Sequence, residues 1–150
     1  MKPIIPPPII LLFFIGVVFG IDAFSPFDLL LGQSRMPLVL AFAGGGVLIA
    51  VLGVLQFRKH KTTINPHAID QAKALVTGGV YRFTRNPMYL GMLLVLVGMV
   101  FYSRDALALV ALPGFVVTLN RLQIRPEERA LAAMFGDAFA AYCQRTRRWI

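Results

Sequence analysis

Residues 36–57 read MPLVLAFAGGGVLIAVLGVLQF, a run in which no side chain carries a charge. A helix rises about 1.5 Å per residue, so a helix over this run is long enough to cross the roughly 30 Å hydrocarbon layer of a bilayer. We therefore predict a membrane-spanning helix over residues 36–57. This run sets the fold class of the whole chain, because a single such span places a protein in a membrane.

The rest of the 150-residue chain has the same character. Hydrophobic residues make up 57% of it and charged residues 15%, and the mean hydropathy is +0.71. Three further apolar runs cover about residues 4–21, 87–103 and 106–120. We predict one all-α domain over residues 1–150, a polytopic integral membrane protein with four transmembrane helices. Pro113 lies inside the last run, where a proline is expected to kink the helix.

The first apolar run could instead belong to a cleaved signal peptide. Such a peptide needs a basic start and a small-residue cleavage site. The start holds only Lys2, and the sequence GIDA at residues 20–23 is a poor cleavage site. We favour an uncleaved span.

Basic residues are concentrated beside the predicted spans. The net charge is +8, and most of the Lys and Arg side chains fall in the connection 58–86 and in the tail from Arg121 onward. Cytoplasmic loops carry an excess of Lys and Arg, so we predict that the connection is a cytoplasmic cap and that both termini are cytoplasmic. A short chain with small loops is typical of the bacterial inner membrane. Because topology explains the basic residues, we expect no nucleic-acid partner.

Two polar clusters adjoin the apolar runs. Residues 79–91 read GVYRFTRNPMYLG, and residues 125–129 read RPEER, with the only adjacent carboxylates of the chain, Glu127 and Glu128. Together they suit a cationic, polar ligand held beside lipid. The alternatives are interfacial anchoring by Tyr and Arg in the first cluster and helix capping by the two acids in the second.

The second cluster opens a predicted amphipathic C-terminal helix over residues 126–145. Apolar residues recur along it at helical spacing, at Leu131, Met134, Phe135, Phe139 and Tyr142. The residues that follow, Arg147, Arg148 and Trp149, suit the headgroup region of a membrane.

Metal ligands are not clustered in the sequence. His60 and His67 lie seven positions apart with no further His, Cys or paired acid near them, and Cys143 is the only cysteine. We expect no metal site.

Three ordered blocks resemble a known family. They are ALVTGGVYR at residues 74–82, RNPMYLG at residues 85–91, and EE at residues 127–128, followed at the family's spacing by Leu131, Phe135, Gly136 and Tyr142. With these blocks the C-terminal half is similar to the integral membrane methyltransferases that include isoprenylcysteine carboxyl methyltransferase and the phospholipid N-methyltransferases.

The resemblance implies a cytoplasmic pocket for S-adenosylmethionine. The family's cofactor contacts fall on Lys73, Ala74, Leu75, Val76, Tyr81, Asn86, Pro87, Met88, Tyr89 and Glu127. The eukaryotic enzymes carry His in place of Lys73 and Asn86, so no general base carries over and no catalytic residue is assigned. A substrate-contacting arginine of the family falls on Gln123. Arg121 or Arg125 is expected to replace it, and Glu128 is a further candidate for substrate binding.

We therefore predict methyl transfer from S-adenosylmethionine to the oxygen, nitrogen or sulfur of a lipophilic or membrane-embedded small acceptor. Transfer from a sulfonium mainly requires alignment of donor and nucleophile and the exclusion of water. Two other functions stay open at this point. One is a nicotinamide-dependent membrane reductase of related fold, and the other is a non-enzymatic four-span transporter or scaffold.

Overall fold

The computed structural model describes residues 5–25, 35–59 and 74–150, and every element in these ranges is helical. The long elements are α1 (Pro7–Phe24), α2 (Arg35–Lys59), α3 (Pro87–Ser103), α4 (Ala111–Leu119) and α5 (Arg125–Arg145). Two short 3-10 helices, η3 (Gly79–Arg82) and η4 (Leu107–Val110), and a π-helical segment, η5 (Asn120–Ile124), complete the order. The prediction of an all-helical protein is confirmed.

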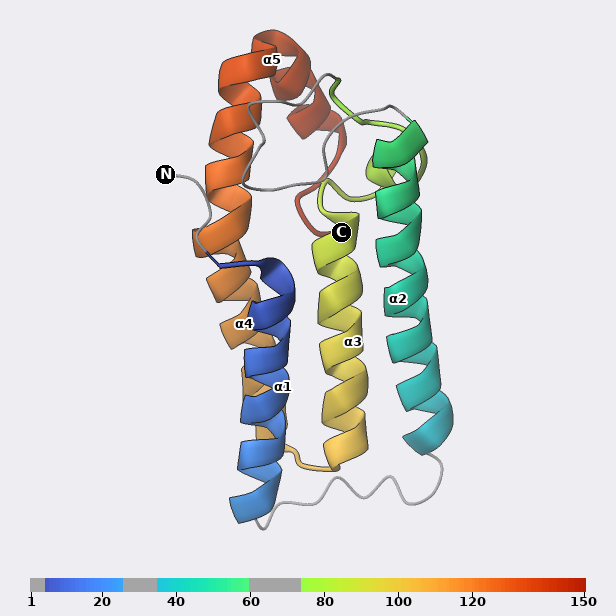
Figure 1. The fold of residues 1–150 in the computed structure, drawn as a ribbon, viewed down its shortest axis with the longest axis vertical. Coiled ribbons are helices and arrows are strands. Elements are labelled where there is room, and N and C mark those ends of the chain that lie inside the picture. The colour runs from blue at the N-terminus through green and yellow to red at the C-terminus, as the bar shows by residue number, and fades with distance from the viewer. Residues whose placement is uncertain (1–4, 26–34, 60–73) are drawn as a thin grey trace.

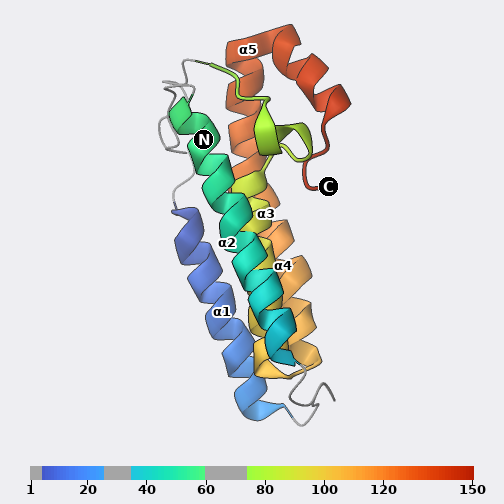
Figure 2. The same ribbon diagram turned by 90° about the vertical axis from the view of Figure 1, so that its right-hand side faces the viewer.

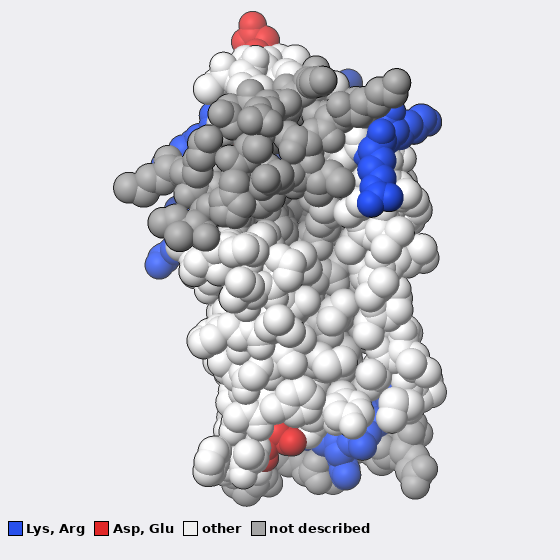
Figure 3. Space-filling model, in the orientation of Figure 1, with Lys and Arg blue, Asp and Glu red and all other residues white. Residues whose placement is uncertain are grey.

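Three helical stretches are long and apolar enough to cross a membrane: α1, α2 and the unbroken run Leu107–Arg145. The remaining apolar helix, α3, is shorter, with 17 residues. Figure 3 shows an uncharged band around the middle of the visible face, with charged side chains near its two ends. These features make the chain an integral membrane protein, while the count of four crossings and the cytoplasmic cap remain predictions.

The helices form an elongated bundle in which α3 lies between α2 and α1 (Figures 1 and 2). The α2–α3 contact is close because glycines face backbone across it. A Cβ added to Gly91 would lie 2.4 Å from the carbonyl oxygen of Gly46, and one added to Gly98 would lie 3.2 Å from that of Val39. Small residues allow helices in lipid to approach in this way.

The apolar core lies where α1, α3 and α4 meet. Val18, Leu96, Phe115 and Leu119 are fully buried there. The rings of Phe14 and Phe115 meet edge to face with centroids 5.5 Å apart. Such pairs stabilise a core beyond the area that they bury.

The end of the chain differs from the predicted division into a span over 106–120 and a separate helix over 126–145. Helix continues without a break from η4 through α4 and η5 into α5. Pro113 is only the third residue of α4, directly after the 3-10 helix η4, and α4 shows no non-helical backbone there. Helical backbone angles do not decide whether the axis bends at Pro113, so the expected kink stays a prediction.

The last helix, α5, bends at Gly136. Its φ of +46° lies in the left-handed region that glycine adopts without strain. Beyond this residue, α5 turns back over the end of the bundle, and the C-terminus lies beside the start of α3 (Figures 1 and 2). This turn brings the last residues of the chain to the predicted polar clusters.

Candidate cofactor pocket

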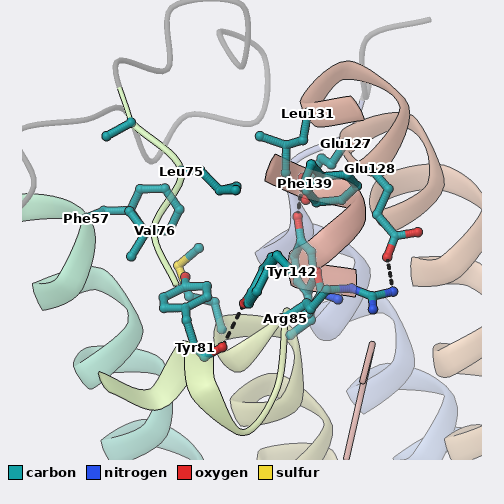
Figure 4. A pocket seen from close by; sticks show the side chains of 14 residues that line it. Phe57, Leu75, Val76, Tyr81, Arg85, Glu127, Glu128, Leu131, Phe139 and Tyr142 are labelled. Carbon is teal, nitrogen blue, oxygen red and sulfur yellow. Dashed lines mark hydrogen bonds and ion pairs between the residues drawn. The ribbon is translucent and has the colours of Figure 1, made fainter. Parts of the chain in front are cut away.

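A pocket lies where α5 folds over the segment that leads into α3 (Figure 4). Its walls come from the end of α2, the segment 74–76, η3, the first turn of α3 and α5. The lining residues are Phe57, Ala74, Leu75, Val76, Tyr81, Arg85, Asn86, Met88, Tyr89, Glu127, Glu128, Leu131, Phe139 and Tyr142.

Local sequence explains how the chain reaches this pocket. Gly79 has a φ of +59°, which a residue with a side chain rarely adopts, and it starts the 3-10 turn that carries Tyr81. Asn86 is not helical, with φ −130° and ψ 58°, and Pro87 then takes the first position of α3. A proline is well suited to that position because its missing N–H has no helical partner there.

Glu127 presents a partly buried carboxylate to the pocket. We take the crossing part of the last helical run to end near residue 124, because the sequence RPEER at the start of α5 is too highly charged for hydrocarbon. Burial raises the pKa of the Glu127 carboxyl to about 7, opposed by a hydrogen bond of 2.5 Å from the Tyr89 hydroxyl and reinforced by the charge of Glu128. Within the described residues no cation contacts this carboxylate.

Glu128, its neighbour, has the opposite environment. Arg85 Nη2 lies 2.8 Å from one carboxylate oxygen, and Arg148 donates to both oxygens at 3.1 and 2.5 Å. Burial alone would raise the pKa of Glu128, but the hydrogen bonds from Arg148 and Arg85 outweigh it and hold that pKa below its ordinary value. The two adjacent carboxylates therefore differ: Glu128 is paired to arginines, whereas Glu127 faces the pocket and meets no cation in the described ranges.

Tyrosine rings form much of the pocket wall. The Tyr142 hydroxyl donates to the backbone oxygen of Tyr81 at 2.7 Å, and the rings of Phe57 and Tyr81 meet edge to face. Burial raises the pKa of Tyr81, so its hydroxyl keeps its proton. That hydroxyl is buried and, among the described residues, has no hydrogen-bond partner. An orphaned donor in a pocket wall indicates a place for a ligand.

The C-terminal segment, residues 146–149, holds the loop before α3. The oxygen of Arg148 accepts from the Thr84 hydroxyl at 3.2 Å and from the Asn86 amide at 2.9 Å. Arg85 donates through its backbone N–H to Arg147 and through its side chain to the oxygen of Thr146 at 2.6 Å. The tail therefore helps to hold the pocket together. The sequence did not indicate this role, because residues 147–149 were expected only to suit the headgroup region of a membrane.

A family model described as "PEMT: Phospholipid methyltransferase" matches residues 35–138. The chain belongs to the phospholipid methyltransferase family. An uncharacterised protein of Haemophilus influenzae is 36% identical over 63 residues, which cover 42% of this chain and the whole of that protein. No solved structure matches significantly. The predicted resemblance is confirmed, and membership of the family makes the chain a membrane methyltransferase; nothing found supports the reductase or the transporter.

In this phospholipid methyltransferase relative, most residues expected to bind cofactor line one pocket. They are Ala74, Leu75, Val76, Tyr81, Asn86, Met88, Tyr89 and Glu127. Pro87 is buried at the start of α3 and packs toward Gly53 rather than lining the pocket. Lys73 lies outside the described residues.

The structure separates the three residues expected to bind substrate. Glu128 lines the pocket, but Arg121 and Arg125 are exposed and do not. They lie four positions apart, on the outward face of a helix whose inward face holds Gln123 and Ile124. Gln123 is fully buried and donates to the oxygen of Ile5. Neither arginine faces this pocket, and their proposed role as substrate contacts stays a prediction.

Five lining residues were not proposed from the sequence as site residues: Phe57, Arg85, Leu131, Phe139 and Tyr142. The last three belong to the apolar stripe of the C-terminal helix, so the stripe marks the face that covers the pocket. Arg85 is the first residue of the block RNPMYLG and could have been proposed as a site residue from the sequence. Phe57, at the end of a span, had no local signal.

Proposed function

We propose that this phospholipid methyltransferase relative uses S-adenosylmethionine to methylate a lipophilic acceptor, and that the pocket beneath α5 holds the cofactor. The observation that carries the proposal is the Glu127 carboxylate, which is partly buried in the pocket wall, with no cation against it in the described part of the chain. A buried carboxylate is costly unless a partner compensates it. A ligand bearing a sulfonium and an ammonium supplies that partner.

The remaining walls fit the other parts of such a ligand. The faces of Tyr81 and Tyr89 can border a cation, and the orphaned Tyr81 hydroxyl can hydrogen-bond a polar group. The Arg85 Nε, also buried without a partner among the described residues, is a donor suited to a carboxylate. Backbone groups of residues 74–76, which are not in a helix, can meet the edge of a purine.

When bound, S-adenosylmethionine would supply an electrophilic methyl group. The chain's own residues orient and shield the reaction. Glu127 holds the cationic part of the ligand, Tyr89 fixes the Glu127 carboxylate, and the aromatic wall excludes water. The Asn86 amide is bound to the tail, so it acts here by positioning the loop. No general base is assigned.

The position of the pocket supports a membrane-embedded acceptor. Tyr89 lines the pocket and also belongs to the apolar core that α1, α3 and α4 build. A lipophilic molecule in the bilayer would therefore meet the cofactor at the end of α3. The basic connection 58–86 supports a cytoplasmic pocket in a bacterial inner membrane.

The test is calorimetric binding of S-adenosylmethionine and S-adenosylhomocysteine to detergent-purified protein, with NADPH for comparison. We expect both adenosyl ligands to bind and NADPH not to. Tyr81→Phe should weaken adenosyl binding without lowering the thermal unfolding temperature, because it removes a hydroxyl that bonds nothing in the described residues. Folded protein that binds neither adenosyl ligand would refute the proposal.

A further inference from the structure

A second, polar pocket lies between η3 and the end of α5. It is lined by Thr77, Arg82, Tyr142, Arg145 and Thr146. None of the residues proposed to bind cofactor or acceptor lines it, and Tyr142 is the one lining residue shared with the cofactor pocket. The methyl-transfer proposal leaves this pocket without a role.

The lining has the chemistry of an anion site. Two arginines and two threonine hydroxyls border it, and no carboxylate is among the lining residues. The nearest acid in the cofactor pocket wall, Glu128, is already held by Arg85 and Arg148. Guanidinium groups bind phosphate through paired, charge-assisted hydrogen bonds, and hydroxyls add further donors.

The frame of this pocket is built from two segments that are distant in sequence. The Thr146 hydroxyl approaches the oxygen of Arg82 at 3.5 Å, and Tyr142 bonds the oxygen of Tyr81. The Arg145 Nε donates to its own helix at the oxygen of Ala141. Figure 2 shows η3 and the end of α5 side by side at the end of the bundle where α3 begins. The arginines are therefore carried by a fixed backbone.

Two apolar side chains point to a lipid as the source of the anion. Phe83, next to Arg82, is 79% exposed, and Ile150, close after Arg145, is 78% exposed. Both lie beside the entry of α3 into its apolar run. Exposed apolar groups beside arginines at a membrane boundary match a phospholipid, whose phosphate and chains lie next to each other.

We propose that the pocket between η3 and the end of α5 binds the phosphate of an anionic phospholipid of the surrounding leaflet. Arg82 and Arg145 hold the phosphate, Thr77 offers a hydroxyl donor, and Phe83 and Ile150 reach toward the acyl chains. This lipid is separate from the methyl acceptor, because none of the residues proposed to bind cofactor or acceptor lines this pocket.

The test counts lipid adducts on the detergent-solubilised chain by native mass spectrometry during titration with phosphatidylglycerol or phosphatidylcholine. Wild-type protein should retain phosphatidylglycerol preferentially. The R82Q/R145Q variant should bind it about thirtyfold more weakly, since each arginine near an anionic lipid contributes roughly a factor of five. The matched control, R58Q/R129Q, removes two exposed arginines that do not line the pocket and should bind as wild type does.

Three outcomes would overturn the proposal. One is equal weakening in both double variants, which would show attraction by overall charge. Another is displacement of the lipid by inorganic phosphate at equal concentration, which would make a soluble phosphate the ligand. The third is loss of S-adenosylhomocysteine binding together with lipid binding in R82Q/R145Q, because separate pockets predict that the adenosyl ligand still binds.

Discussion

Tyr89→Phe gives the sharpest test of how the pocket binds a cation. The change removes only the hydroxyl that donates to Glu127 at 2.5 Å and leaves the buried ring in the core. A hydrogen bond to a charged group contributes about 1.5–3 kcal/mol. Its loss favours the neutral form of Glu127, whose pKa therefore rises above its wild-type value of about 7.

The magnitude follows from that energy. At pH 7 about half of the wild-type carboxyl is ionised, and 1.5–3 kcal/mol corresponds to roughly a ten- to hundredfold lower ionised population in the variant. If only the ionised form binds the cation, the affinity for S-adenosylmethionine at pH 7 falls by a similar factor. The deficit should shrink as the pH rises, because ionisation then becomes favourable again.

The assay is calorimetric affinity for S-adenosylmethionine between pH 6 and pH 7.5, below the ordinary α-amino pKa of about 8, so that the ligand keeps both positive charges. Among the described residues, the titratable groups around Glu127 are Tyr89, Tyr81 and Glu128; Tyr81 stays neutral and Glu128 stays ionised in this range. Tyr142→Phe is the matched control, since its hydroxyl bonds a backbone oxygen and not a carboxylate. A Tyr89→Phe deficit that is the same at every pH would refute the reasoning.

Three further predictions use the same protein. Glu127→Gln should weaken adenosyl binding and abolish the rise of that binding with pH. It should also stabilise the ligand-free protein above pH 7 by on the order of 2 kcal/mol, because a pKa raised by burial means that ionisation of Glu127 opposes folding. Lower stability of the variant in unfolding assays would contradict this. Arg148→Ala should lower the free energy of unfolding by about 1–3 kcal/mol, because it removes the ion pair with the half-buried carboxylate of Glu128. Arg147→Ala, which removes an exposed side chain, should leave that free energy within about 0.5 kcal/mol of the wild-type value. Equal effects of the two changes would count against the role of the tail in holding the pocket together. Gly91→Ala should destabilise by about 1–3 kcal/mol because its Cβ would meet backbone across the α2–α3 contact, while Gly45→Ala, with open space around it, should not; equal thermal unfolding of the two would contradict the packing.

Much of the fold was accessible from the sequence because lipid imposes simple constraints. Uncharged runs of spanning length predicted the helices, and α3 begins and ends at the predicted residues 87 and 103. The site was accessible where motifs named it. Glu127 is distant in sequence from Tyr81 and Tyr89, and the structure brings all three to one pocket.

The parts that sequence did not predict depend on backbone geometry. The tail contacts Thr84 and Asn86 through carbonyl oxygens, which every residue has, so no residue pattern indicates them. Which of Arg121, Gln123 and Arg125 turns inward depends on the phase of the helix, and the π-helical segment before α5 alters that phase. The left-handed Gly136, which folds the last helix back, is one glycine among 13.

The helical run that begins at Leu107 and bends at Gly136 links the membrane core to the cofactor pocket. Phe115 and Leu119 pack into the apolar core in the membrane part of this run, and Glu127 lies further along the same helix. A helix in a thinner or thicker bilayer tilts to match the hydrocarbon. A tilt of this helix relative to α3, which carries Tyr89, would change the distance between Tyr89 and Glu127. We therefore expect bilayer thickness to affect the spacing between the two groups proposed to hold the methyl donor.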